Sequence, residues 1–159
     1  MCIRDSDLAE GNNFSSKVQS FASNENTECI KISAQVESEL IELEPEDKKD
    51  YLVGLGVEEG GLSSLIRSTY KLLGLKTYFT TGEKETKAWT IKDGMTAPQA
   101  AGVIHTDFEK GFIRAQTISY QDLIDSGSIA KAKTKGLLRS EGKEYVVNEG
   151  DVMEFLFNV

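Results

Sequence analysis

The sequence is poor in the residues that build metal centres and disulfide frameworks. Its 159 residues include two cysteines, Cys2 and Cys29, and one histidine, His105. A zinc site usually takes four cysteine or histidine ligands at characteristic spacings, which these three residues cannot supply. We therefore expect neither a metal site nor a disulfide, and the single histidine needs another explanation.

Long apolar runs and an excess of basic residues are also missing. No run approaches the roughly 20 apolar residues of a membrane span, and residues 1–10 lack the apolar core of a signal peptide. With 18 basic and 26 acidic residues the net charge is −8, which argues against a broad nucleic-acid surface because phosphate contacts need concentrated positive charge. We expect a cytoplasmic protein that binds neither membranes nor DNA, and any contact with RNA must be local.

Apolar residues at helical spacing dominate residues 1–74. Phe14, Val18 and Phe21 recur at intervals of four and three, and they predict a helix that ends near Ser23. Three more helices are expected, over residues 36–43, 45–56 and 60–73, and Gly74 is the expected stop of the last one. Residues 1–6 are unrelated to this pattern, and we expect them to be a non-native leader.

A short buried strand is expected over residues 28–32. It ends at Ser33, Ala34 and Gln35, after which a helical pattern resumes. Because ligands of open α/β sheets bind at the carboxyl ends of strands, these three residues are positioned for a loop that contacts a nucleotide base. An ordinary turn between a strand and a helix is the more common origin of such a tripeptide.

The sequence changes to strand patterns at Leu75. One helix is expected over Ala97–Ile104, and a helical segment is expected over residues 120–133. Strands and a crossing helix in a mixed sheet predict an α+β roll of the β-grasp kind. We therefore expect two domains, residues 1–74 and residues 75–159. The expected strands cover residues 76–80, 86–91, 112–118, 136–139, 145–147 and 152–157.

His105 is expected on the loop that joins the 97–104 helix to the 112–118 strand. A lone histidine beside an aspartate, here Asp107, is usually a structural hydrogen-bonding residue. The alternative is a surface imidazole that stacks on or hydrogen-bonds RNA, since proteins commonly bind single-stranded RNA through its bases.

With these residues in view, the sequence resembles the carboxyl-terminal part of the YchF or Obg-like ATPase family, over residues 7–159. Members have a P-loop nucleotide-binding domain followed by a TGS domain, which is a β-grasp module. The resemblance implies that this chain holds the truncated α/β end of the P-loop domain followed by the whole TGS domain. It rests on residues 32–35, which lead into 37–43, and on residues 61–74, 77–80, 88–91, 97–108 and 150–153.

The resemblance implies that the full-length parent binds and hydrolyses ATP with Mg²⁺, with GTP as an alternative nucleotide. No catalytic residue can be assigned in this chain, which lacks the P-loop and the switch residues, and we expect it to bind no cofactor by itself. Ser33, Ala34 and Gln35 match the family's base loop, although Gln35 stands where relatives often have lysine.

The TGS resemblance implies a ribosome partner, through the large subunit, or a tRNA partner. His105 is the central contact candidate, and the alternative is a non-catalytic β-grasp adaptor for protein partners. We expect four cations to gather on the side of His105, namely Lys84, Lys87, Lys110 and Arg114.

Overall fold

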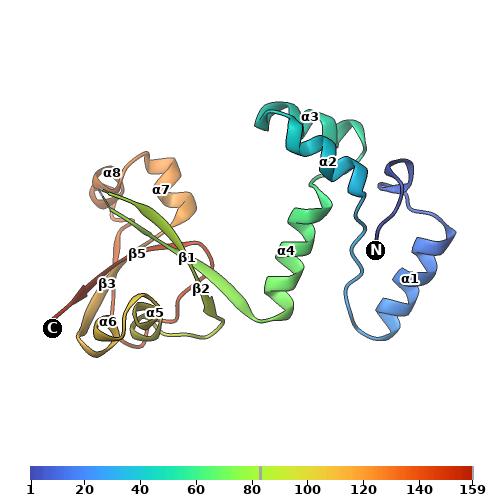
Figure 1. Cartoon of the computed structure of the whole chain (residues 1–159). Coiled ribbons are helices and arrows are strands. Elements are labelled where there is room, and N and C mark those ends of the chain that lie inside the picture. Colours follow the sequence, from blue (N-terminus) through green and yellow to red (C-terminus); the bar gives the residue numbers. More distant parts are fainter. Residues whose placement is uncertain (83, 159) are drawn as a thin grey trace. The chain divides into compact units, whose positions relative to one another are not determined.

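The computed structural model describes residues 1–82 and 84–158 and divides into two compact units, Met1–Leu72 and Leu73–Val159 (Figure 1). The expected boundary after residue 74 lies two residues beyond this division. The first unit is largely helical, and the second combines helices with a five-stranded sheet, which confirms the α+β class.

Local sequence signals explain the helices of the first unit. Asn12 caps α1 with its side-chain oxygen, which accepts hydrogen bonds from the backbone N–H groups of Phe14 and Ser15 at 3.0 and 2.9 Å. Pro45 occupies the start of α3, where its missing N–H costs nothing. The expected helices are confirmed. Their bounds are Asn13–Asn24 (α1), Ala34–Glu42 (α2), Pro45–Gly54 (α3) and Gly61–Leu72 (α4), and a 3₁₀ turn at Asp5–Asp7 (η1) was not expected.

The buried strand expected over residues 28–32 is wrong. The segment is extended, but among the described residues it pairs at a single point, where the Ile3 N–H donates to the Ile32 oxygen at 2.8 Å and the Ile32 N–H donates to the Met1 oxygen at 2.9 Å. Residues 1–3 thus pair with the extended segment, whereas the expectation that residues 1–6 are a non-native leader stays a prediction. Both hydrogen bonds join backbone atoms, so the pattern of side chains in the sequence does not predict them.

The second unit is built on a mixed sheet with the strand order β2-β1-β5-β3-β4 (Figure 1). β1 and β5 run parallel, whereas the other neighbouring pairs are antiparallel. The strands are Leu75–Thr81 (β1), Thr86–Lys92 (β2), Phe112–Ser119 (β3), Arg139–Glu141 (β4) and Asp151–Phe157 (β5). The helices are Ala97–Ile104 (α5), Thr106–Lys110 (α6), Tyr120–Ser126 (α7) and Ile129–Thr134 (α8).

Helices cover the sheet on both sides because successive strand residues point to opposite faces. Figure 1 shows α5 and α6 on one side of the sheet and α7 and α8 on the other. Tyr78 and Met153 belong to the core under α5, with Ala97, Ala100 and Ala101 of that helix. Their neighbours on the opposite face form a second cluster under α7 and α8, which includes Phe79, Ile118, Val152, Leu123 and Ala132.

Four expected segments of this unit differ in the structure. The helical segment over residues 120–133 is two helices, because Gly127 adopts a left-handed conformation (φ +73°) that ends α7. The strand expected over residues 136–139 lies at Arg139–Glu141, and the one over residues 145–147 is reduced to a single bridge between Thr96 and Val146. The connector after His105 contains the short helix α6.

We expect the stability of the second unit to fall at alkaline pH because of Tyr78. Its hydroxyl is fully buried and donates to the Ala100 oxygen at 2.9 Å, and burial raises the pKa of this hydroxyl above its ordinary value of 10.0. A group whose pKa is raised by folding stabilises the fold below its unfolded pKa and loses that contribution as the pH rises. The thermal midpoint should therefore drop above about pH 10.

Tyr78→Phe should reduce this alkaline drop, with Tyr145 maintaining part of it because burial also raises the pKa of that hydroxyl. Tyr120→Phe is the matched control, since the Tyr120 ring is exposed. Thermal melts between pH 8 and 11 measure the effect. An identical drop in wild type and Tyr78→Phe would exclude Tyr78 as its source.

Candidate functional site

The helix α5 positions His105. Its N-terminus is fixed by Gln99, whose side-chain oxygen accepts the Thr96 backbone N–H at 2.9 Å, and Pro98 lies in its first turn. Three alanines bury the inner face of α5, so the helix lies close against the sheet. Its orientation, and with it the position of His105 at its end, is therefore determined by the core.

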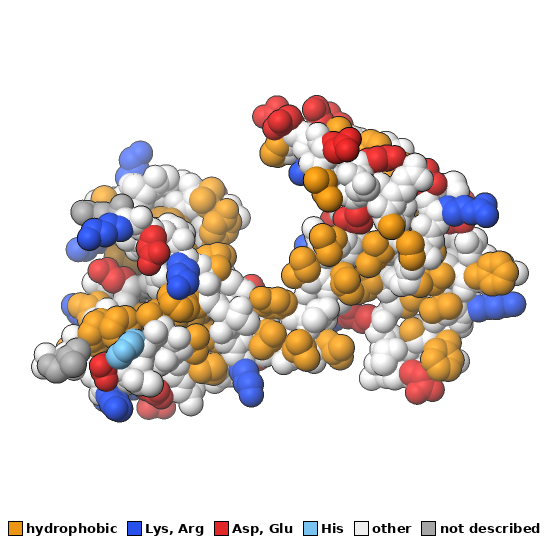
Figure 2. Space-filling model, in the orientation of Figure 1, with side chains coloured by type: hydrophobic (Ala, Val, Ile, Leu, Met, Phe, Trp, Pro, Cys, Tyr) orange, Lys and Arg blue, Asp and Glu red, His pale blue; other side chains and the backbone are white. Residues whose placement is uncertain are grey.

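His105 joins two helices, because it is both the C-cap of α5 and the N-cap of α6. Its Nδ1 accepts the backbone N–H of Asp107 at 3.2 Å, so the neutral ring carries its proton on Nε2. The Asp107 carboxylate is 3.4 Å from the same Nδ1. The side chain nevertheless remains 61% exposed, and Figure 2 shows the imidazole at the surface beside hydrophobic side chains.

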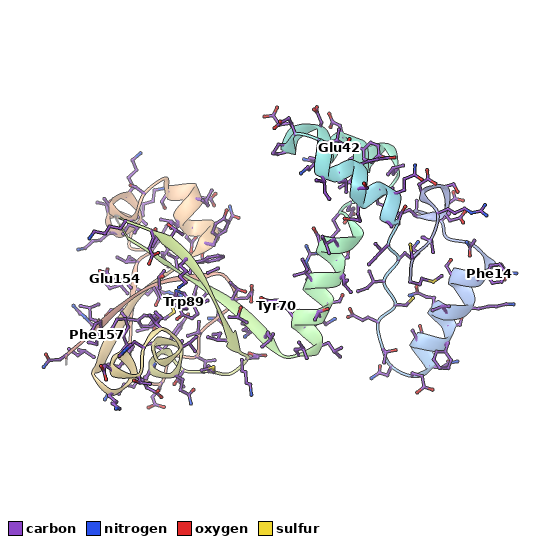
Figure 3. The ribbon with its side chains drawn as sticks, in the orientation of Figure 1. Phe14, Glu42, Tyr70, Trp89, Glu154 and Phe157 are labelled. Carbon is purple, nitrogen blue, oxygen red and sulfur yellow. The ribbon has the colours of Figure 1, made fainter. Side chains whose placement is uncertain are left out.

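An aromatic row lies behind the imidazole. The ring of Phe108 is 6.1 Å from that of His105, and it stacks on Phe157 with centroids 3.9 Å apart. Phe157 belongs to the end of β5, as Figure 3 shows. We define His105, Phe108 and Phe157 as the aromatic site. Phe108 and Phe157 were not predicted to belong to it, because the two stacked rings lie 49 positions apart in the sequence.

Gly111 allows the end of β5 to approach this site. The Asn158 N–H donates to the Gly111 oxygen at 2.9 Å, and a Cβ on Gly111 would lie 2.0 Å from the Asn158 oxygen. No side chain fits there without moving the backbone. The glycine that follows Lys110 was the one sequence signal for this close approach.

The four expected cations do not gather on one face. Lys87 lies on the α5 side of the sheet, with its Nζ 4.0 Å from the centre of the Trp89 ring. Arg114 of β3 pairs with Leu156. Its neighbour Ala115 is buried in the core under α5, and successive strand residues point to opposite faces, so Arg114 lies on the other side of the sheet. Lys84 is exposed in the hairpin connection between β1 and β2, and Lys110 is exposed at the end of α6. Only Lys110 shares a helix with the aromatic site.

The acidic charge of the chain is concentrated in the first unit. Residues 1–72 contain 7 basic and 14 acidic residues, whereas residues 73–159 contain 11 and 12. The net charges are therefore −7 and −1. The overall charge of −8 consequently does not oppose RNA binding by the second unit.

Ser33, Ala34 and Gln35 begin α2 in the first unit. The buried Ser33 Oγ caps that helix by accepting the Val36 N–H at 3.4 Å, and the exposed Gln35 side chain donates to Glu39 at 3.1 Å. A groove of about 560 Å³ in this unit is lined by residues 27–31 rather than by these three. Of the three residues, Ala34 and Gln35 are exposed.

The start of α4 packs against the residues on either side of the tripeptide. The Glu37 carboxylate accepts the Gly61 N–H at 2.7 Å, at the start of α4. A Cβ on Gly61 would lie 3.0 Å from the Ile32 backbone, so this close contact favours glycine. The N-terminus of α4 is thereby held against the residue that precedes Ser33.

Within residues 1–82 and 84–158, no three His, Cys, Asp or Glu side chains are grouped as a metal site requires. None of the helices in this described part combines the length and apolarity needed to cross a bilayer.

The comparisons with known proteins agree on one family. Residues 75–158 match the family YchF-GTPase_C, described as a protein of unknown function (DUF933). The chain is 54% identical over 149 residues to the ribosome-binding ATPase YchF of Bacillus subtilis (strain 168) and 53% identical over 150 residues to that of Escherichia coli O157:H7. Each alignment covers 94% of this chain and 41% of the relative, so the chain spans less than half the length of these proteins.

Solved structures show the same relationship. The Schizosaccharomyces pombe YchF GTPase aligns with a TM-score of 0.77 and 34% identity, over 92% of this chain and 39% of that one. A GTP binding protein from Pyrococcus horikoshii OT3 aligns with a TM-score of 0.64 over 99% of this chain and 45% of its own, and at 20% identity it supports the fold alone. The family match covers more than half of the sequence and agrees with the resemblance stated above, so the chain belongs to the YchF-GTPase_C family.

Proposed function

We propose that the chain is the carboxyl-terminal part of a ribosome-associated ATPase, and that its second unit is a TGS module of β-grasp fold that contacts RNA. The observation that carries the proposal is the exposed His105 ring, held between two helices and backed by Phe108 and Phe157. The name of the relatives, ribosome-binding ATPase, supports a ribosome partner. Such a partner implies a cytoplasmic protein.

The aromatic site suits an unpaired RNA base. Bases that are splayed out of a helix stack on aromatic or histidine rings, and each such stack is worth about 1–3 kcal/mol. His105 offers a ring face together with an Nε2–H donor, and the caps of α5 and α6 limit the entropy lost on binding. Lys110 supplies a nearby positive charge. RNA of the large ribosomal subunit or the end of a tRNA fits this chemistry, with Lys84, Lys87 and Arg114 as outer contacts.

In the full-length parent, we propose that Ser33, Ala34 and Gln35 line the base of ATP, with GTP as the alternative nucleotide. Ser33 is buried and its hydroxyl caps α2, so the exposed side chains of Ala34 and Gln35 would contact the ligand and Ser33 would position them. The chain contains no P-loop sequence, in which two glycines separated by four residues are followed by lysine and by serine or threonine, so it offers no phosphate loop of that kind. The triphosphate and its metal would be held by the rest of the parent.

The chain alone should therefore hydrolyse no ATP. Phosphoryl transfer depends on a phosphate cradle and a bound metal, neither of which these residues supply. Release of phosphate from ATP in the presence of Mg²⁺ should equal the buffer blank, and nucleotide affinity should be very weak. Turnover that persists through repurification would contradict the assignment of the catalytic parts to the remainder of the parent.

Co-sedimentation of the chain with 70S ribosomes and with separated subunits tests the ribosome contact. We expect binding to 70S and large subunits and competition by purified ribosomal RNA. The alternative is a non-catalytic β-grasp adaptor for protein partners, which the exposed apolar side chains of Tyr120, Ile124 and Ile129 favour. Ribosome binding that ribosomal RNA fails to displace would support the adaptor. Absence of ribosome binding would refute the proposed function.

A further inference from the structure

The helix α8 and its flanks form a basic segment without acidic residues. Residues 126–140 contain four Lys and Arg side chains and no Asp or Glu, although acidic residues outnumber basic ones in the whole chain. Three of these cations are Lys131, Lys133 and Lys135, and all three are exposed. The fourth, Arg139, forms an ion pair with the buried Asp151 carboxylate, which lies 3.6 Å from its guanidinium.

The other lysines of the second unit stand beside carboxylates, except Lys87, which lies over the Trp89 ring. Lys76 is paired with Asp93 at 2.6 Å. In the sequence Lys84 lies between two glutamates, Lys92 precedes an aspartate, Lys110 follows a glutamate and Lys143 precedes one. By contrast, no described carboxylate lies within ion-pair distance of the three α8 lysines. They are therefore the strongest local concentration of uncompensated positive charge in this unit.

The anchoring of α8 fixes where these lysines project. Ala132 is fully buried against Ile118 and Leu137, so this residue defines the inner side of the helix. Consecutive helical residues are turned by about 100°, which directs Lys131 and Lys133 to opposite flanks. Lys135 follows Lys131 by one turn on the same flank. Figure 2 shows blue side chains around the α8 end of the second unit.

We infer that Lys131, Lys133 and Lys135 form a binding surface for the phosphate backbone of ribosomal RNA, separate from the aromatic site. This α8 lysine surface rests on the proposed ribosome contact and adds a second attachment to it. The charge complementarity favours a polyanion, because the lysines lack acidic neighbours that would neutralise them. Phosphate contacts add affinity without base specificity, whereas the aromatic site contacts bases.

The salt dependence of binding tests this surface. Each phosphate contact contributes about 0.7 to 0.9 to the slope of log affinity against log salt concentration, so replacing three lysines should lower that slope by about 2 to 3. The variant is Lys131→Gln, Lys133→Gln and Lys135→Gln in the full chain. Its affinity for 70S ribosomes and for extracted ribosomal RNA is measured between 50 and 200 mM salt, beside its thermal midpoint.

The matched control replaces three other exposed lysines, Lys49, Lys92 and Lys143, by glutamine. Its slope should equal that of wild type, and a Lys→Arg version of the α8 variant should retain the wild-type slope. An unchanged slope in the α8 glutamine variant, while wild type binds, would overturn the inference and leave the proposed function intact. A reduced slope with ribosomes but not with extracted RNA would also overturn it, because the surface would then contact a ribosomal protein.

Discussion

Gly111→Ala should strongly destabilise the second unit at the end of the sheet that carries the aromatic site. The new Cβ would lie 2.0 Å from the Asn158 oxygen and 2.9 Å from its carbon, both of which are backbone atoms. A flexible side chain could move aside, but here the last pair of the β3–β5 ladder must separate. Overpacking typically costs about 1–3 kcal/mol, and we expect the upper part of this range.

For a unit of this size, each kcal/mol lowers the thermal midpoint by about 4–8 °C, so the midpoint should fall by roughly 10 °C or more. Gly142→Ala is the control, because nothing lies within 4 Å of its added Cβ. That variant should melt within about 3 °C of wild type, as surface substitutions usually do. Equal midpoints for the two variants would contradict the close approach of Asn158 to Gly111.

Elements governed by local signals could be predicted from the sequence. The caps Asn12, Ser33 and Thr96 lie next to the helices that they start, and the periodicity of the following residues defines the buried faces. The strands β1 and β2 were predicted for the same reason, since each is a short run of alternating residues. In each case the deciding contacts lie within a few residues of one another.

Features that depend on distant pairing could not be predicted. The stack of Phe108 on Phe157 exists because β3 and β5 are neighbours in the sheet, and the sequence alone does not specify that register. The alternation of strand residues places Lys87 of β2 and Arg114 of β3 on opposite faces of the sheet. The bridge at Ile32 involves backbone groups, which carry no sequence signature.

Replacing His105 should weaken ribosome binding more than it weakens the fold. The side chain is largely exposed. Its Nδ1 accepts the Asp107 N–H and lies 3.4 Å from the Asp107 carboxylate, and its ring lies 6.1 Å from that of Phe108. Losing a stacked base would cost about 1–3 kcal/mol, which corresponds to roughly 5- to 150-fold in Kd. His105→Ala removes both the ring and the cap. His105→Asn removes the ring while an asparagine oxygen can still cap α6.

The most direct measurement is the Kd of wild type and His105→Asn for 70S ribosomes at two salt concentrations, together with both thermal midpoints. We predict a Kd at least about 5-fold higher for His105→Asn at both salt concentrations, with the midpoint within about 3 °C of wild type. An unchanged Kd would contradict the role of His105 in RNA binding. A lower midpoint of His105→Asn with intact binding would identify His105 as a structural hydrogen-bonding residue.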